Sequence, residues 1–233
     1  MKKYDLTMMK TALVFSEESQ AIKLKVGAVL AKDGRILVTG YNGTISGQSN
    51  LCEDCFIILP ELSPTPYNLI SLLPALQVYI KDGFLTLCYK QDKEIKLIIM
   101  AESVLRLNFK SKDINFLINM LPNYKQSQET QDKLTSILIR LLISDKLEGK
   151  GNFTLTLKTK PYVLHAEQNV IAYAAKKGIS VEGATLYITH SPCKECAKMI
   201  AQTGIKEVIY SIEYRDRSGI EFLSNLGIQV RAL

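Results

Sequence analysis

The sequence lacks an apolar run long enough to cross a membrane. The longest such run, residues 69–80, is interrupted by Pro74 and Gln77, and it falls short of the roughly 20 residues that a spanning helix needs. The N-terminus has neither an uninterrupted apolar segment nor a small-residue cleavage site, since Asp5 and Lys10 break it. We therefore expect no signal peptide, no membrane partner and a cytoplasmic location.

The sequence also lacks a segment in which charge of one sign gathers. Its 29 basic and 23 acidic residues give a net charge of +6 that is spread along the chain. Proteins that follow a nucleic-acid backbone need clustered lysines and arginines, so we do not expect a nucleic-acid partner. With 47% hydrophobic residues and no dominant residue type, the chain is also not a disordered one, and its 233 residues suffice for one large or two small domains.

The cysteines do not have the number expected of a disulfide framework. There are five of them, an odd count, and four form two C-x-x-C pairs, Cys52/Cys55 and Cys193/Cys196, while Cys88 stands alone. Without a signal peptide, this usage indicates free thiols and metal ligands in a reducing compartment.

The two ends of the chain carry an alternating pattern of helices and strands. Apolar spacing predicts a helix over residues 6–21 with one apolar face, formed by Leu6, Met9 and Leu13 and flanked by Met8, Ala12 and Phe15. Asp33-Gly34 between two β-rich runs predicts a hairpin of residues 26–31 and 36–39. After Pro161 we expect helices over 165–177, 191–203 and 218–225, and strands over 184–189, 208–210 and 228–230. This alternation is typical of an α/β fold with some parallel pairing.

Residues 56–157 interrupt that pattern. They begin with a proline cluster, and they contain predicted strands over 84–89, 94–100 and 153–157 and predicted helices over 112–120 and 130–142. We interpret them as an inserted α+β subdomain of about 100 residues whose role the sequence does not show. The main domain would then consist of residues 1–55 and 158–233.

Two short segments carry the chemistry. His165-Ala166-Glu167 and Pro192-Cys193-Lys194-Glu195-Cys196 each stand at a predicted helix start, with Ser191 as the expected N-cap of the second helix. One imidazole and two thiolates are three protein ligands for a tetrahedral Zn²⁺, which leaves a fourth position for water, as in a catalytic site. We predict that His165, Cys193 and Cys196 bind one zinc ion.

Glu167 is the natural proton carrier of this site. Zinc lowers the pKa of a bound water to about 7, and a carboxylate that is not itself a ligand can take that proton and pass it on. An alternative is a structural Cys₄ site made from the two C-x-x-C pairs, but it leaves His165-x-Glu167 unexplained. The order H-x-E then P-C-x-x-C is the signature of zinc nucleobase deaminases.

At this point the chain resembles a known family. Residues 4–55 and 158–231 are similar to the deoxycytidylate (dCMP) deaminase branch of the cytidine deaminase-like superfamily. The stretches that carry the resemblance, in family order, are Val26-Gly27-Ala28-Val29, Gly40-Tyr41-Asn42-Gly43, His165-Ala166-Glu167-Gln168-Asn169, Gly183-Ala184-Thr185-Leu186-Tyr187, Ser191-Pro192-Cys193-Lys194-Glu195-Cys196-Ala197 and Gly204-Ile205-Lys206-Glu207-Val208-Ile209-Tyr210.

The resemblance implies a three-layer α/β/α cytidine deaminase-like fold with a mixed central sheet, and hydrolysis of dCMP to dUMP and ammonia. It gives His165, Cys193 and Cys196 as zinc ligands and Glu167 as the proton shuttle. It further implies that substrate contacts come from Asn42, Ala166 and Tyr214.

The resemblance also implies an allosteric homo-oligomer. Its effectors would be dCTP and dTTP, with Mg²⁺ accompanying the nucleotide, near a loop that contains Gly43, Gly47 and Asn50. Some relatives carry a cysteine at the position of Ala21 for a second, structural zinc. Ala21 cannot ligate a metal, so a second site here would have to begin from Cys52 and Cys55.

Two other functions stay open at this level. A tRNA-adenosine type deaminase shares the zinc motif, although the unclustered charge disfavours it. A regulatory or binding protein on a deaminase scaffold is the second alternative, and the retained Glu167 disfavours it.

Overall fold

The computed structural model describes residues 3–59, 63–68, 76–81, 84–91, 94–101, 127–129, 132, 136–137, 139–140 and 154–233. Of these described residues, those that fall between 55 and 101, and residues 154–155, are described by their backbone alone. The chain divides into two compact units, residues 1–48 with 161–233, and residues 49–160. Within the described residues, no helix combines the length and apolar character needed to cross a bilayer.

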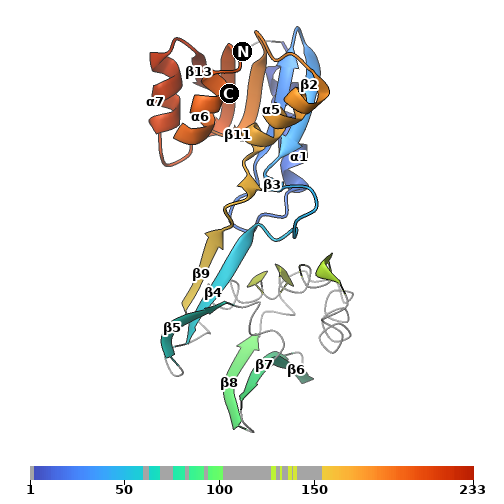
Figure 1. Ribbon diagram of the computed structural model, residues 1–233, viewed down its shortest axis with the longest axis vertical. Helices are drawn as coiled ribbons and strands as arrows, with labels where there is room; N and C mark the ends of the chain where they lie inside the picture. Colours follow the sequence, from blue (N-terminus) through green and yellow to red (C-terminus); the bar gives the residue numbers. More distant parts are fainter. Residues whose placement is uncertain are drawn as a thin grey trace. The chain divides into compact units, whose positions relative to one another are not determined.

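The first unit is built on a mixed five-stranded sheet (Figure 1). Its strand order is β13-β12-β11-β1-β2. β1 pairs antiparallel with β2 and with β11, while β11, β12 and β13 run parallel. The strands are β1 (Gly27–Lys32), β2 (Arg35–Tyr41), β11 (Thr185–His190), β12 (Glu207–Ile212) and β13 (Gln229–Ala232).

Both faces of this sheet are covered by helices. Side chains two residues apart along a strand share a face, and the core divides accordingly. Ala28, Leu186 and Val208 belong to the cluster formed with α5 (Ala166–Lys177), α6 (Lys194–Ala201) and α7 (Ser218–Asn225). Their neighbours Val29, Tyr187 and Ile209 pack with α1 (Asp5–Glu17). The predicted three-layer α/β/α fold is confirmed (Figure 1).

The predicted apolar face of the first helix is correct for Met9 and for the flanking Met8 and Ala12, which are buried, and wrong for Leu6 and Leu13, which are about half exposed. The charged Asp5 is buried as well. It accepts hydrogen bonds from Tyr187 and Arg231 of the sheet. The buried stripe thus includes an acidic residue with buried partners, and its centre lies along Asp5, Met8, Met9 and Ala12, which apolarity alone does not predict.

The other predicted elements of this unit agree with the structure to within a few residues. Asp33 and Gly34 both have positive φ, of 51° and 75°, as the tight hairpin turn between β1 and β2 requires. α5 ends at Gly178, in the left-handed conformation. The exception is α6, which begins at Lys194, so its N-cap is Cys193 and not Ser191.

The second unit contains two three-stranded sheets. One has the order β5-β4-β9 and the other β6-β7-β8. The predicted strands are confirmed as β7, β8 and β9, whereas the other three were not predicted. The bounds are β4 (Glu53–Leu59), β5 (Ser63–Asn68), β6 (Leu76–Lys81), β7 (Phe84–Gln91), β8 (Glu94–Ala101) and β9 (Thr154–Thr159).

One strand that the sequence did not predict, β5, has a composition unusual for a strand. β5 contains Pro64 and Pro66, which cannot donate to a sheet ladder. The two prolines are tolerated because β5 is an edge strand.

The predicted helix over 112–120 lies outside the described residues. Of the predicted helix over 130–142, the described positions 132, 136–137 and 139–140 are helical.

β4 and β9 pair with one another across both predicted domain boundaries. Glu53 lies opposite Thr159, and Cys55 lies opposite Leu157. The predicted junctions at 55/56 and 157/158 therefore fall inside a two-stranded ribbon, while the compact units divide at 48/49 and 160/161.

Candidate functional site

Two helix N-termini carry the predicted zinc ligands. His165 is the N-cap of α5 and Cys193 is the N-cap of α6, and both have extended backbone with φ of −70°. The Cys193 thiol makes no cap hydrogen bond with α6, whereas His165 and Gln168 form a reciprocal capping box at the start of α5. The positive ends of two helix dipoles therefore adjoin the same group of ligands and favour thiolate there.

The three ligand atoms have the separations of a tetrahedral metal site. Nδ1 of His165 lies 3.4 Å from Sγ of Cys196 and 3.6 Å from Sγ of Cys193, and all three atoms lie within 4.8 Å of one another. Ligands bound to Zn²⁺ at about 2.0–2.3 Å in a tetrahedron stand roughly 3.3–3.8 Å apart. The donor set and its spacing fit zinc, and within the described part of the chain no other group of metal-ligating side chains is as close.

The pKa values of the two cysteine thiols are shifted in opposite directions by their contact with each other. Hydrogen bonds from Cys196 and His165 lower the pKa of Cys193 to about 3. The same contact with Cys193, followed by burial, raises the pKa of Cys196. A dication at the centre of the group would displace the remaining proton, so metal binding here releases protons.

Glu167 lies in the first turn of α5, two residues after a ligand, and is 3% exposed. Burial raises the pKa of its carboxyl to about 7, while its own backbone N–H and the charge of His165 oppose the shift. A carboxyl group with this pKa exchanges protons readily near neutral pH. The predicted shuttle is thus placed beside the ligands and out of bulk water.

The ligand-bearing end of α5 is held by side-chain amides. The backbone N–H of His165 donates to Oε1 of Gln168 at 2.8 Å, and Nδ2 of Asn169 donates to the carbonyl of Tyr41 at 2.8 Å. The residues just before His165 form β10 (Val163–Leu164), which pairs with β3 (Gly43–Thr44). The backbone of His165 is therefore held on both its N-terminal and its C-terminal side.

The cysteine-bearing loop is held by contacts that the sequence did not show. Ser191, expected as an N-cap, instead accepts a hydrogen bond on Oγ from the backbone N–H of Tyr214 at 2.7 Å. Its own N–H donates to the carbonyl of Ile212 at 2.9 Å. Gly219 of α7 packs so closely that a Cβ there would lie 2.1 Å from the Pro192 carbonyl oxygen. α7 thus supports the backbone that carries Cys193.

Asn42 is occupied by backbone contacts. Its Oδ1 accepts from the N–H of Val26, and its Nδ2 donates to the carbonyl of Leu24, both at 2.8 Å. An amide has a second lone pair and a second hydrogen, so these contacts leave capacity for a substrate hydroxyl. Asn42 as a substrate contact stays a prediction.

The other two predicted substrate contacts reach the ligands in different ways, Ala166 through the sequence and Tyr214 through a hydrogen bond. Ala166 is fully buried between His165 and Glu167. The Tyr214 ring is half-buried, its backbone is tied to Ser191, and the guanidinium of Arg215 lies 5.8 Å from the ring centroid. Their contact with a substrate stays a prediction.

The predicted effector loop has a different environment at each end. Gly43 lies in β3, opposite Leu164. Gly47 has a φ of 87° and open space around it. The N–H of Asn50 donates to Oδ2 of Asp132 at 2.7 Å. Asp132 was not among the predicted residues, because nothing in its local sequence marks it, and two of its partners, Ser49 and Asn50, lie 83 and 82 residues away.

The second predicted metal site remains a prediction. Cys52 is buried, and its thiol lies 3.8 Å from the carbonyl oxygen of Asn50. Cys55 lies in β4, and its side chain is outside the described residues.

Comparison with known proteins identifies the family. The profile described as "Cytidine and deoxycytidylate deaminase zinc-binding region" matches residues 2–212. The deoxycytidylate deaminases of Enterobacteria phages T4 and T2 are each 31% identical over 226 residues, which is 96% of this chain and 86% and 89% of those proteins.

A solved structure agrees with this result. The dCMP deaminase from cyanophage S-TIM5, in complex with dCMP and dUMP, is 28% identical with a TM-score of 0.54, over 100% of this chain and 99% of that one. Since the match spans nearly the whole chain and includes the His165, Cys193 and Cys196 group with Glu167 beside it, the chain belongs to the cytidine and deoxycytidylate deaminase family.

Proposed function

We propose that this enzyme hydrolyses dCMP to dUMP and ammonia. The observation that carries the proposal is a buried carboxyl, Glu167, next to a three-ligand zinc group with tetrahedral spacing. The relatives that align over nearly the whole chain are deoxycytidylate deaminases, and this supports a deoxynucleoside monophosphate as the substrate.

Each side chain of the site then has a definable task. His165, Cys193 and Cys196 hold the metal, which when bound lowers the pKa of a coordinated water to about 7 and so supplies the nucleophile. Glu167 would accept one proton from the attacking water and deliver it to N3 of the cytosine. It would then take the second proton of the same oxygen and deliver it to the departing amino group. Its pKa of about 7 allows both uptake and release of a proton at neutral pH.

The surroundings of the ligands would hold the substrate. Asn42 would contact the sugar with its second amide hydrogen or lone pair, and the backbone of Ala166 would read the base. The Tyr214 ring would pack on the pyrimidine, since its backbone is tied to Ser191, two residues before Cys193.

The regulatory part of the proposal concerns the loop from Gly43 to Asn50. It would bind dCTP or dTTP with Mg²⁺ in a homo-oligomer in the cytoplasm. The pairing of Gly43 with Leu164, the neighbour of His165, supports it, because a change in the loop would reach a zinc ligand through one residue.

A substrate panel tests the proposal. Ammonia release is measured with dCMP, CMP, dCTP, cytidine and an adenosine-containing tRNA, each with and without added dCTP and dTTP. We expect the highest kcat/KM for dCMP. Activity on the tRNA with none on dCMP would overturn the proposed substrate, and release from no compound by zinc-loaded protein would overturn the enzymatic role.

A further inference from the structure

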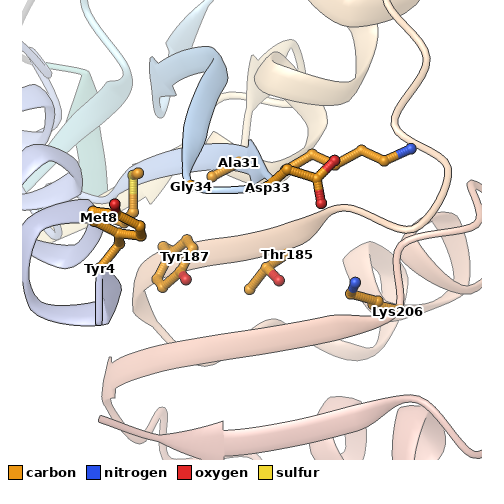
Figure 2. A pocket seen from close by; sticks show the side chains of 9 residues that line it. Tyr4, Met8, Ala31, Asp33, Gly34, Thr185, Tyr187 and Lys206 are labelled. Carbon is orange, nitrogen blue, oxygen red and sulfur yellow. The ribbon is translucent and has the colours of Figure 1, made fainter. Parts of the chain in front are cut away.

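A pocket of about 310 Å³ lies beside the start of β11 and the turn between β1 and β2 (Figure 2). This is the end of the sheet opposite to the zinc ligands. The pocket is formed where β11 begins, whereas the loop carrying Cys193 follows the end of that strand. Ala31 and Tyr187 in its wall belong to the face covered by α1, while the ligands belong to helices of the other face. The lining residues are Tyr4, Met8, Ala31, Lys32, Asp33, Gly34, Thr185, Tyr187 and Lys206. The proposed reaction does not use this pocket.

One side of the pocket is apolar and aromatic. Tyr4 and Met8 come from the start of α1, and Tyr187 comes from β11 (Figure 2). The Tyr4 ring packs on Gly34, where a Cβ would lie 2.8 Å from the ring, and Nζ of Lys3 lies 5.3 Å from the ring centroid. The residue nevertheless remains 44% exposed. A supported aromatic ring that is still partly open to solvent is suited to stacking with a flat ligand.

The hydroxyl groups in the pocket present acceptors. Tyr187 donates its proton to Oδ1 of the buried Asp5 at 2.9 Å, and Thr185 donates to Oε2 of the buried Glu207 at 3.3 Å. Arg231 bonds both carboxylates and so holds them in place. Because each hydroxyl has committed its single proton, the oxygens can only accept from a ligand. The ligand ring should therefore carry N–H or amino donors.

The open side of the pocket carries positive charge. Lys206 is exposed, and among the described residues no ion pair is found for its ammonium group. Lys32 donates through Nζ to the carbonyl oxygen of Glu182 at 2.8 Å, a neutral partner that leaves its charge uncompensated. Asp33 is the one acidic residue in the lining. Two ammonium groups against one carboxylate favour an anionic ligand.

We propose that this pocket binds a small organic anion of nucleotide type: a flat ring with N–H donors, stacked near Tyr4, and a pendant phosphate or carboxylate at Lys206 and Lys32. Its volume is at the lower end of the range for small-molecule sites, which begins at about 300 Å³. The inference stands on the residues of this pocket and does not depend on the proposed substrate.

Calorimetric titration of the zinc-loaded enzyme tests the proposal. The probes are GMP, which has ring and amino donors with a phosphate, 4-aminobenzoate, which has an amino donor with a carboxylate, and inorganic phosphate. Saturating dUMP is present throughout to occupy the proposed active site. Tighter binding of GMP indicates that the site takes phosphate, and tighter binding of 4-aminobenzoate indicates carboxylate.

Two variants locate the binding. Lys206→Gln and Tyr4→Ala should each weaken it about tenfold, as expected for loss of a charge-assisted contact or an aromatic one. The control, Lys10→Gln, changes an exposed lysine elsewhere on α1 and should leave binding unchanged. kcat/KM for dCMP should be unaltered in Lys206→Gln.

Three results would contradict the proposed binding site. Absence of saturable binding of GMP and 4-aminobenzoate at millimolar concentration would overturn the proposal. So would equal affinity in Lys206→Gln and wild type, or binding of inorganic phosphate as tight as that of GMP, since the ring would then contribute nothing.

Discussion

The chain contains two C-x-x-C pairs of the same spacing in different backbone conformations. Cys193 is the N-cap of α6 and Cys196 lies in its first turn. Cys52 directly precedes β4, and Cys55 lies within that strand. Residues three apart share one side of a helix, whereas in an extended strand they fall on opposite faces. The same spacing therefore lies on one side of a helix at Cys193 and Cys196, whereas the backbone from Glu53 to Cys55 is an extended strand.

The surroundings of the two pairs differ as well. His165 brings an imidazole to 3.4 Å and 3.6 Å from the sulfurs of the second pair. Near the first pair, the loop before Cys52 is held by Asp132, through hydrogen bonds from Ser49 Oγ and the Asn50 N–H at 2.7 Å each. We infer that a metal organises one region, and that a buried carboxylate organises the other.

The largest expected effect concerns zinc content. Cys193→Ala and His165→Ala should each lose the metal and all measurable dCMP deamination, because two remaining ligands hold zinc poorly. Cys52→Ala and Cys55→Ala are the matched changes in the other pair, and should keep one zinc per chain. Atomic absorption and ammonia release measure both. Full zinc occupancy in Cys193→Ala, or loss of zinc in Cys52→Ala, would break the comparison.

The next largest expected effect is on kcat, when the buried glutamate beside each cysteine pair is replaced by glutamine. Glu167→Gln keeps the size of the side chain but removes the proton carrier, so kcat should fall by roughly 10²–10⁴-fold with zinc retained. Glu53→Gln alters a carboxyl that is also buried, next to Cys52, and should leave kcat near the wild-type value. Near-native turnover in Glu167→Gln would show that another group moves the proton.

Removal of the Asp132 carboxylate should reduce stability and leave zinc in place. Asp132→Ala leaves Ser49 Oγ and the Asn50 N–H without their acceptor, and loss of charge-assisted hydrogen bonds of this kind costs about 1.5–3 kcal/mol. Urea denaturation gives the free energy of unfolding. Glu129→Ala, at an exposed neighbouring position, is the control and should change little. Zinc loss in Asp132→Ala would mean that the two regions depend on each other.

The smallest expected effect is a change in pH dependence. His190 lies three residues before Cys193, and the equivalent position before Cys52 is Ser49. Burial lowers the pKa of the His190 imidazole from 6.5. Between the folded pKa and 6.5 the unfolded chain binds more protons. The free energy of unfolding should therefore rise with pH through that window and become flat above it.

His190→Gln should remove this part of the slope, which denaturation at several pH values between 5 and 8 would measure. Because other groups contribute equally to both proteins, the difference between their two curves isolates His190. Identical curves would contradict the assignment.

Much of the fold and site followed from local patterns. The spacing of Cys193 and Cys196, the Asp33-Gly34 turn and the glycine at the end of α5 are local signals, because each depends on the conformation of a few neighbouring residues. The helix over 218–225 was predicted with the bounds that the structure shows. The zinc ligands and Glu167 were likewise accessible from residue type and spacing alone.

Other features depended on residues far apart in the sequence. The buried face of α1 follows from Asp5, whose partner Arg231 lies at the other end of the chain. The role of Ser191 follows from Tyr214, and the strand β5, with its two prolines, is tolerated because it lies at a sheet edge.

The sequence by itself thus indicated which residues could bind a metal and which family the chain resembles, because metal chemistry demands particular donor atoms in recognisable motifs. Only the tertiary structure decided where Asp5, Asp132 and Ser191 act and that a second pocket exists at the far end of the sheet. Buried polar groups form hydrogen bonds wherever packing brings donors and acceptors together. Because the partners are far apart in the sequence, no local pattern predicts these hydrogen bonds.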